Sequence, residues 1–145
     1  MSEKIYSKIE DGLLLHLITC QEDISGMTFL TPENEFLQLA SLKLQKGYVF
    51  RPHKHLLKEG QQKVRTQEAW VVIEGSAKFI MYDIDNTVIA ERILNRGDCS
   101  VTFRGGHSYE ILTEDTMVYE FKTGPYSDVS IDKEYIDVKK EKDND

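Results

Sequence analysis

Short apolar stretches separated by turn residues follow one another along most of the chain. Their spacing of about 8–12 residues is typical of a β-sandwich or β-barrel, and it does not suit alternating strands and helices. Two short edge strands are expected before residue 35, of which 13–20 is the clearer. The later predicted strands cover 36–44, 49–55, 69–73, 77–83, 87–94, 99–103, 107–112 and 116–123. The pattern therefore predicts an all-β fold without a substantial helix.

Alternation within these strands groups several polar side chains. Side chains at positions i and i+2 of a strand point to the same side, so His53 and His55 share one face. Glu68 opens the following strand and shares its face with Trp70 and Val72. If both faces look into one cavity, two imidazoles and a carboxylate converge there. The large apolar surface of Trp70 favours a place in the core over a role in contacting a ligand.

A third imidazole is available on a later strand. His107 and Tyr109 share a face, which would place a phenol beside a third nitrogen donor. Arg51 lies two residues before His53 and shares its face. Its planar guanidinium suits a carboxylate or phosphate of a substrate, and an ion pair with a surface acid is an equally open interpretation. His16 stands alone in its strand and is interpreted as structural.

Length, charge and cysteine content narrow the class of protein. The chain has 145 residues, which corresponds to one domain, and a net charge of −7 disfavours binding to a nucleic-acid backbone. The N-terminal residues lack the pattern of a signal peptide, and no apolar run is long enough for a membrane span, so we expect a cytoplasmic protein. Cys20 and Cys99 are far apart and are expected to be reduced and mostly buried.

Two segments differ from the strand pattern. Residues 56–67 are polar and cationic without an apolar rhythm, and they are expected to form a loop at the edge of the surface that the histidines face. Residues 132–145 are strongly charged and are expected to be solvated and frayed. We therefore expect one domain over 1–131, with a motif-bearing core at 36–126, followed by a disordered tail.

The residues around the histidine pair resemble the first motif of the cupin superfamily. That motif is a Gly, five residues, His-x-His, a spacer, and then a Glu followed by six residues and a Gly. It is matched here by Gly47, His53, His55, Glu68 and Gly75. The spacer is longer than the family's usual three or four residues, which implies a loop insertion.

The alternative carboxylate is Glu59, which fits the short spacer. No Gly follows Glu59 at the matching distance, so Glu68 is preferred. The second cupin motif begins at Gly97, has Phe103 where the family has Pro, and reaches His107 one residue early. A Gly-Gly pair before His107 can re-aim such a shortened connection.

This resemblance implies a double-stranded β-helix of the jelly-roll type and a homodimer paired through an N-terminal strand. It implies one divalent transition metal, Fe, Mn, Ni, Co, Cu or Zn, bound by His53, His55, Glu68 and His107. The stretches RTQEAWVVIEG (65–75), GDCSVTFRGGH (97–107) and EFKTGPYSDVSIDKEY (120–135) are also similar to small stand-alone cupins of bacterial cell-surface polysaccharide gene clusters.

The resemblance to that group implies a small, sugar-like ligand. The function expected first is a metal-dependent enzyme of the isomerase or epimerase type, with Tyr109 or a carboxylate moving protons and Arg51 holding the substrate. The alternatives are a non-catalytic carbohydrate-binding or regulatory module, and an Fe(II) dioxygenase.

Overall fold

The structure is a computed structural model and describes residues 2–58, 64–125 and 133–137. It is built from short strands, as the sequence predicts, and a single 3₁₀ turn at Gln21–Asp23 is the helical element among the described residues. The strands are β1 Glu3–Tyr6, β2 Leu14–Ile18, β3 Met27–Phe29, β4 Leu37–Leu44, β5 His53–His55, β6 Leu57–Lys58, β7 Val64–Arg65, β8 Glu68–Glu74, β9 Ser76–Tyr82, β10 Val88–Asn95, β11 Cys99–Thr102, β12 Gly106–Ile111, β13 Thr116–Thr123 and β14 Lys133–Tyr135. None of the described residues forms a helix long and apolar enough to cross a bilayer.

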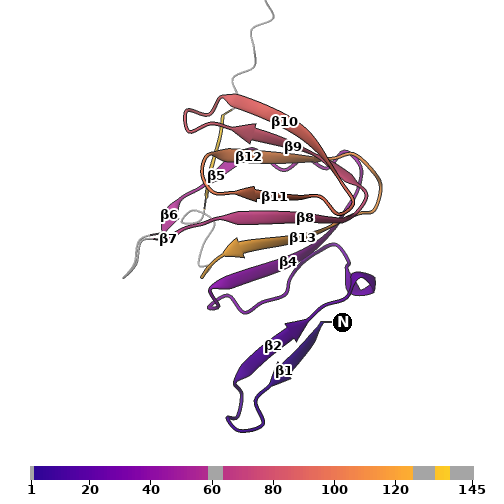
Figure 1. Cartoon of the computed structure of the whole chain (residues 1–145), viewed down its shortest axis with the longest axis vertical. Coiled ribbons are helices and arrows are strands. Elements are labelled where there is room, and N and C mark those ends of the chain that lie inside the picture. Colours follow the sequence, from indigo (N-terminus) through magenta and orange to yellow (C-terminus); the bar gives the residue numbers. More distant parts are fainter. Residues whose placement is uncertain (1, 59–63, 126–132, 138–145) are drawn as a thin grey trace, which may run out of the picture.

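Two five-stranded antiparallel sheets form the body of the molecule (Figure 1). One has the order β10-β9-β12-β5-β14, and the other has the order β11-β8-β13-β4-β3. Strands adjacent in a sheet are often distant in sequence, as where β12 lies between β9 and β5. This arrangement brings residues near position 53 beside residues near position 107, in agreement with the predicted all-β jelly roll.

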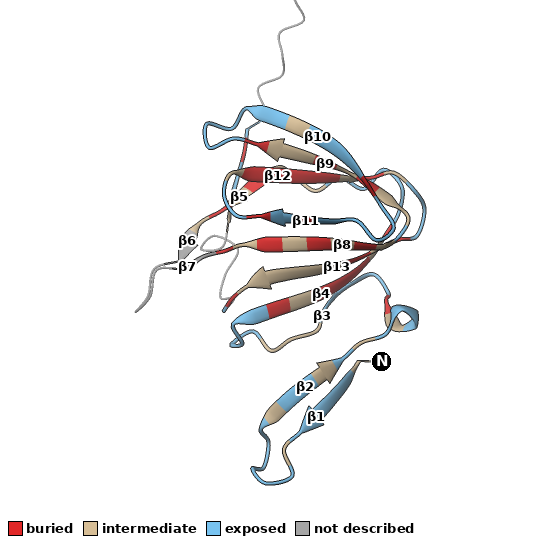
Figure 2. Cartoon of the chain, in the orientation of Figure 1, coloured by how far each residue is buried: buried red, intermediate tan, exposed pale blue. Residues whose placement is uncertain are grey.

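The core lies between the sheets and follows the alternation expected from the sequence. On β8 the side chains of Glu68, Trp70 and Val72 are buried, and those of Ala69 and Val71 are less so (Figure 2). Burying 150–250 Å² of a side chain such as Trp70 contributes about 4–6 kcal/mol as an upper estimate. The apolar core therefore fixes the strand on which Glu68 stands.

The N-terminal region differs from the expected pair of barrel-edge strands. β2 pairs with β1 in a separate two-stranded hairpin, and only β3 joins a main sheet, as the edge neighbour of β4. The hairpin projects from the body and is mostly exposed (Figures 1 and 2). Its strands are close in sequence, so they meet by local pairing.

The predicted loop at 56–67 contains a short hairpin of β6 and β7, and residues 59–63 lie outside the described part of the chain. The expectation of a solvated tail from residue 132 is wrong for 133–137. β14 pairs with β5, and Ile136 is buried, because packing on the sheet outweighs the polar local composition. The remaining tail residues, 132 and 138–145, lie outside the described ranges. The two cysteines are exposed, contrary to the expectation of burial.

Candidate metal centre

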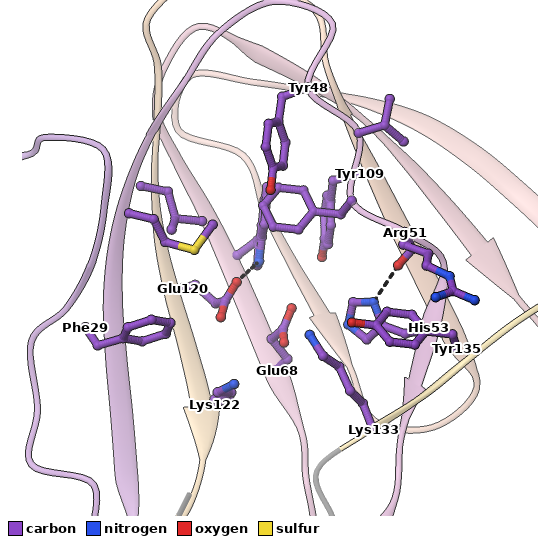
Figure 3. Close-up of a pocket in the computed structure, with 15 residues that line it drawn as sticks. Phe29, Tyr48, Arg51, His53, Glu68, Tyr109, Glu120, Lys122, Lys133 and Tyr135 are labelled. Atoms are coloured by element: carbon purple, nitrogen blue, oxygen red, sulfur yellow. Dashed lines mark hydrogen bonds between the residues drawn. The ribbon is translucent and has the colours of Figure 1, made fainter. Parts of the chain in front are cut away.

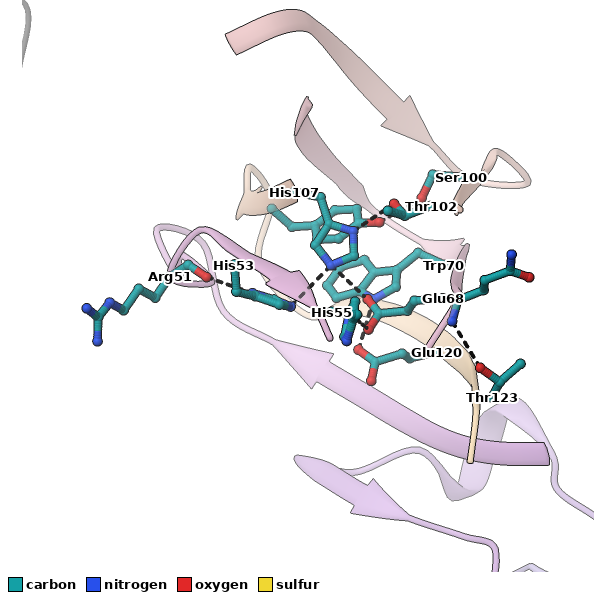
Figure 4. A network of polar contacts seen from close by, with 12 residues as sticks. Arg51, His53, His55, Glu68, Trp70, Ser100, Thr102, His107, Glu120 and Thr123 are labelled. Atoms are coloured by element: carbon teal, nitrogen blue, oxygen red, sulfur yellow. Dashed lines mark hydrogen bonds and ion pairs between the residues drawn. The ribbon is translucent and has the colours of Figure 1, made fainter. Parts of the chain in front are cut away.

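Four buried side chains from three strands meet between the two sheets (Figure 4). β5 supplies His53 and His55, and the antiparallel register of β12 places His107 directly opposite His53. Glu68 comes from β8 in the facing sheet. One sheet thus supplies three imidazoles and the other supplies the carboxylate, and the four residues predicted from the sequence as ligands are brought together.

The donor atoms of this cluster are close to one another. Nε2 of His55 is 3.1 Å from Oε2 of Glu68, and Nε2 of His107 is 3.4 Å from Oε1 of the same carboxylate. The Nε2 atoms of His53 and His107 are 3.2 Å apart. One donor atom from each of the four residues falls within a group whose members all lie within 4.8 Å of one another.

Hydrogen bonds on the far sides of two rings orient them toward this group. Nδ1 of His53 lies 2.8 Å from the backbone oxygen of Arg51, and a carbonyl can only accept, so Nδ1 carries the proton. The lone pair of His53 is therefore on Nε2, which faces the cluster. Nδ1 of His107 lies 2.7 Å from the Thr102 hydroxyl, whose oxygen can accept a hydrogen bond from an N–H at this position.

Burial sets the charge of the cluster. Removal from water lowers the pKa of His53 to about 3, and the nearby His107 adds to this effect. Burial also lowers the pKa of His107 to about 4, against the opposing attraction of Glu68. Burial acts to raise the pKa of the Glu68 carboxyl, but the adjoining imidazoles of His107 and His55 outweigh it and lower the pKa to about 2. At neutral pH His53 and His107 are neutral donors beside an ionised carboxylate.

The donor set fits a divalent first-row metal ion. Neutral imidazole nitrogens and a carboxylate oxygen are ligands of Zn, Fe, Mn, Ni, Co and Cu, and the absence of a thiolate from the cluster leaves the choice among them open. Ligands that share an ion at metal–ligand lengths of about 2.0–2.2 Å lie roughly 3.0–3.5 Å from their neighbours. The three spacings of 3.1, 3.2 and 3.4 Å fall in this range.

A cavity of about 380 Å³ opens beside the cluster and is lined by His53 and Glu68 (Figure 3). Three further charged groups in its wall escaped the sequence-based prediction: Glu120, Lys122 and Lys133. Alternation along β13 could have revealed Glu120 and Lys122, because they lie two and four residues after the buried Val118 and so share its face. Lys133 is on β14, which the composition of the tail concealed.

Glu120 occupies the middle of the cavity wall near Glu68 (Figure 3). Its Oε2 accepts a hydrogen bond of 2.9 Å from the indole nitrogen of Trp70. Burial raises the pKa of the Glu120 carboxyl to about 7, and the negative charge of Glu68 acts in the same direction. Glu120 can therefore exist in both protonation states near neutral pH.

The two residues predicted to be catalytic both line the cavity, in different settings. Tyr109 is buried, stacks on Trp70 with ring centroids 3.7 Å apart, and shares a hydrogen bond of 2.8 Å with the Ser100 hydroxyl. Burial raises the pKa of Tyr109 far above its usual value. Arg51 is exposed and places its guanidinium carbon 4.1 Å from the centroid of the Tyr135 ring. Roles for Tyr109 and Arg51 in a reaction stay predictions.

The other residues singled out from the sequence also have definite places. Trp70 is fully buried in the core, as expected, and it is also one of the residues that line the cavity. His16 is exposed on β2 and lies outside the metal-binding cluster. Glu59, the alternative carboxylate, lies outside the described residues.

Solved structures with the cupin fold have a similar architecture. KdgF from Halomonas sp. is 20% identical, with a TM-score of 0.55 over 70% of this chain and 79% of that chain. Oxalate decarboxylase from Bacillus subtilis, in a structure at pH 4.6, is 18% identical, with a TM-score of 0.56 over 70% of this chain and 24% of that chain. The coconut allergen cocosin is 11% identical, with a TM-score of 0.51 over 61% of this chain and 22% of that chain.

The chain spans about a quarter of the length of the oxalate decarboxylase chain. Another similar structure of the same enzyme comes from work on its Mn(II) centres. The sequence matches no protein-family model and no curated protein. The likeness is one of architecture: the chain has the cupin fold, with a buried cluster of three histidines and a glutamate that can hold one metal ion.

Proposed function

We propose that this protein is a metal-dependent enzyme that isomerises or epimerises a sugar or sugar derivative. The observation that carries the proposal is the convergence of His53, His55, Glu68 and His107 at the wall of a cavity large enough for a small molecule. The Mn(II) centres of oxalate decarboxylase, a protein of similar architecture, support a metal ion in a protein with this fold. The expectation of a sugar-like ligand comes from the sequence resemblance of residues 65–75, 97–107 and 120–135 to cupins of polysaccharide gene clusters.

A divalent ion held by these four side chains would polarise a carbonyl or hydroxyl oxygen of the substrate and make the adjacent C–H bond more acidic. His53 and His107 present their Nε2 atoms toward the ion, because Arg51 and Thr102 hold the opposite nitrogens. The buried carboxylate of Glu68 partly balances the charge of the ion. The site is thereby preorganised on strands of the core instead of on loops.

Such a reaction removes a proton from a carbon next to the carbonyl and returns one, to the neighbouring carbon in an isomerisation or to the opposite face of the same carbon in an epimerisation, and Glu120 is the carboxylate placed to carry it. It lines the cavity, and the Trp70 indole holds one of its oxygens. Tyr109 is the other candidate, but its hydroxyl is already hydrogen-bonded to Ser100, and burial disfavours its ionised form. Glu120 therefore suits the role of general acid and base better than Tyr109.

The first test is elemental analysis of protein purified without a polyhistidine tag. We expect close to one equivalent of a first-row metal, and loss of that metal in a His53→Ala/His55→Ala variant whose circular dichroism still shows a folded β protein. The metal-loaded protein is then incubated with aldoses and ketoses in D₂O. Deuterium entering at a carbon next to the carbonyl, followed by NMR, supports an isomerase or epimerase.

Two outcomes contradict parts of this proposal. Protein that takes up no metal after incubation with each candidate ion would exclude the metal-dependent mechanism. Stoichiometric metal without any deuterium exchange, together with sugar binding that survives metal removal, would favour a carbohydrate-binding module. Oxygen consumption on addition of a substrate would instead indicate an Fe(II) dioxygenase.

A further inference from the structure

Three cationic side chains surround the cavity: Arg51, Lys122 and Lys133 (Figure 3). We call these three residues the cationic rim. They come from three segments of the chain that are distant in sequence, namely the residues before β5, strand β13 and strand β14. The rim therefore results from the fold and is not a basic stretch of sequence.

The strand register explains why both lysines face the cavity. Lys122 is the cross-strand partner of Glu68, and Lys133 is the cross-strand partner of His55. Cross-strand partners in an antiparallel pair point to the same face of the sheet, with Cβ atoms about 4.5–5.5 Å apart. Each lysine is thus the immediate neighbour of one residue of the metal-binding cluster.

Other cations of the chain are placed differently. Lys54, between the two histidines, points away from the cluster and forms an ion pair of 3.0 Å with Glu134. Lys43 and Lys78 likewise contact surface acids, Asp115 and Glu110. Among the described carboxylates, none lies within ion-pair distance of Arg51 or Lys133. Arg51 instead lies over the ring of Tyr135 at the cavity mouth.

The charge inside the cavity contrasts with the charge of the protein as a whole. The chain has a net charge of −7, whereas the cavity lining has three cations against the two carboxyl groups of Glu68 and Glu120. A divalent ion in the cluster would make the cavity more positive still. Opposite charges a few ångströms apart in a partly enclosed site attract more strongly than in bulk water.

We infer that the ligand of this cavity is an anionic sugar derivative whose carboxylate or phosphate is held by Lys122 and Lys133. This inference rests on the proposed function for the metal and for the sugar-like part of the ligand. Hydroxyl or carbonyl oxygens of the ligand face the metal-binding cluster. Tyr48, which also lines the cavity, offers a flat apolar surface to the sugar ring.

The experiment compares three sugars that differ in their charged group. Metal-loaded protein is titrated by calorimetry with D-glucose, D-glucuronate and D-glucose 6-phosphate, at low and at physiological ionic strength. We expect one or both of the anionic sugars to bind at least 10-fold more tightly than D-glucose, and we expect this preference to shrink as salt is added. The stronger of the two identifies the anionic group as carboxylate or phosphate.

Variants connect any preference to the rim. Lys122→Met/Lys133→Met removes both charges and keeps two flexible apolar side chains, so we expect the preference for the anionic sugar to disappear. Lys54→Met is the matched control, since Lys54 belongs to the same strand pair but faces away from the cavity. It should leave the affinities for all three sugars unchanged.

Metal content is measured on the same samples, which separates this inference from the proposed function. Three results at normal metal content overturn the inference and leave the metal centre unaffected. They are equal affinities for the three sugars, no binding of any of them, and a preference for the anionic sugar that survives in the double variant. Absent metal contradicts the proposed function. In that case the same titrations are made on the metal-free protein. A preference for the anionic sugars that disappears in Lys122→Met/Lys133→Met would still show that the rim binds anions, and the lack of such a preference would overturn the inference.

Discussion

The hydroxyl of Thr102 lies 2.7 Å from Nδ1 of His107, on the side of the ring opposite the contact with Glu68. This contact orients the imidazole so that Nε2 faces the metal-binding cluster, and a hydroxyl that accepts from Nδ1–H leaves the lone pair on Nε2 for a metal ion. Strand β11, which pairs with β8 and carries Thr102, thereby contributes to the site without providing a ligand.

Replacing Thr102 by Val should therefore weaken metal binding without removing a ligand. Loss of such an orienting hydrogen bond lowers metal affinity by about 10–100-fold. Competition with a chromophoric chelator measures the change. Thr102→Ser keeps the hydroxyl and should retain most of the affinity, so equal losses in both variants would argue against this role for the hydrogen bond.

The choice between the two candidate carboxylates can be tested directly. Glu68→Gln removes the negative ligand and should strongly reduce metal affinity, because a neutral amide oxygen is a weaker donor to a divalent ion. Glu59→Gln should leave the affinity unchanged. The same chelator competition applies, and similar losses in the two variants would mean that the loop insertion has been placed wrongly within the first motif, between His55 and its carboxylate.

Glu120→Gln should slow proton transfer while leaving the metal in place. General acid and base groups contribute about 10²–10⁴-fold to a rate, so a fall of at least about 100-fold in deuterium exchange is expected. Tyr109→Phe should have a smaller effect, since its hydroxyl is bonded to Ser100. A larger effect at Tyr109 than at Glu120 would reverse the assignment.

The metal-free protein should lose stability in mild acid. The folded state holds His53 and His107 neutral, with pKa values of about 3 and about 4, whereas the unfolded chain protonates both near 6.5. The unfolded state therefore binds more protons as the pH falls below 6.5, which favours unfolding. Glu120 acts in the opposite direction, because its raised pKa of about 7 lets the folded state take up a proton in the same interval. Between about pH 7.5 and about pH 5 the free energy of unfolding should therefore fall by about 1–2 kcal/mol.

Urea unfolding at the two pH values measures this loss. The metal-free His53→Gln variant cannot take up a proton at this position, so it should show a smaller decrease than the metal-free wild type. Replacement of the exposed His16 by Gln is the control and should leave the pH dependence as it is. An equal decrease in the wild type and in His53→Gln would exclude burial of neutral His53 as a cause.

Gly106 permits the close approach of Ile136, the residue that follows β14, to strand β12. A Cβ at this position would collide with Cδ1 of Ile136 and lie 3.1 Å from the backbone oxygen of His53. Gly106→Ala should destabilise the protein by about 1–3 kcal/mol, as overpacking of a core does. Chemical denaturation measures the change, and adding Ile136→Ala should recover part of it, since that removes the closest clashing atom. A strictly additive double variant would show that the two residues are not coupled.

The strand pattern predicted the cluster well because its members depend on local alternation. His53 and His55 are two residues apart on one strand, and burial of Glu68 in phase with Trp70 follows the same rule. The cupin motif supplied the remaining step, since it relates His107 to the other three. The predicted fold class required only the spacing of strands and turns.

The cationic rim could not be predicted in the same way. Lys122 and Lys133 reach the cavity because β13 and β14 pair with particular residues of β8 and β5, and sequence alone does not give that register. The charged composition around Lys133 predicted a solvated tail, which packing on β5 overrides. The homodimer, the cytoplasmic location and the polysaccharide context stay predictions.

The division of the ligands between the sheets has a mechanical consequence. His53, His55 and His107 belong to one sheet and Glu68 to the other, so a bound ion would join the two layers as a removable cross-link. Emptying the site would leave the layers tied at this end by polar contacts, while the apolar core around Val72, Ile111 and Val118 continues to hold them elsewhere. Without the ion, the two sheets should separate first at the end that carries the cluster, while the end held by the apolar core stays folded.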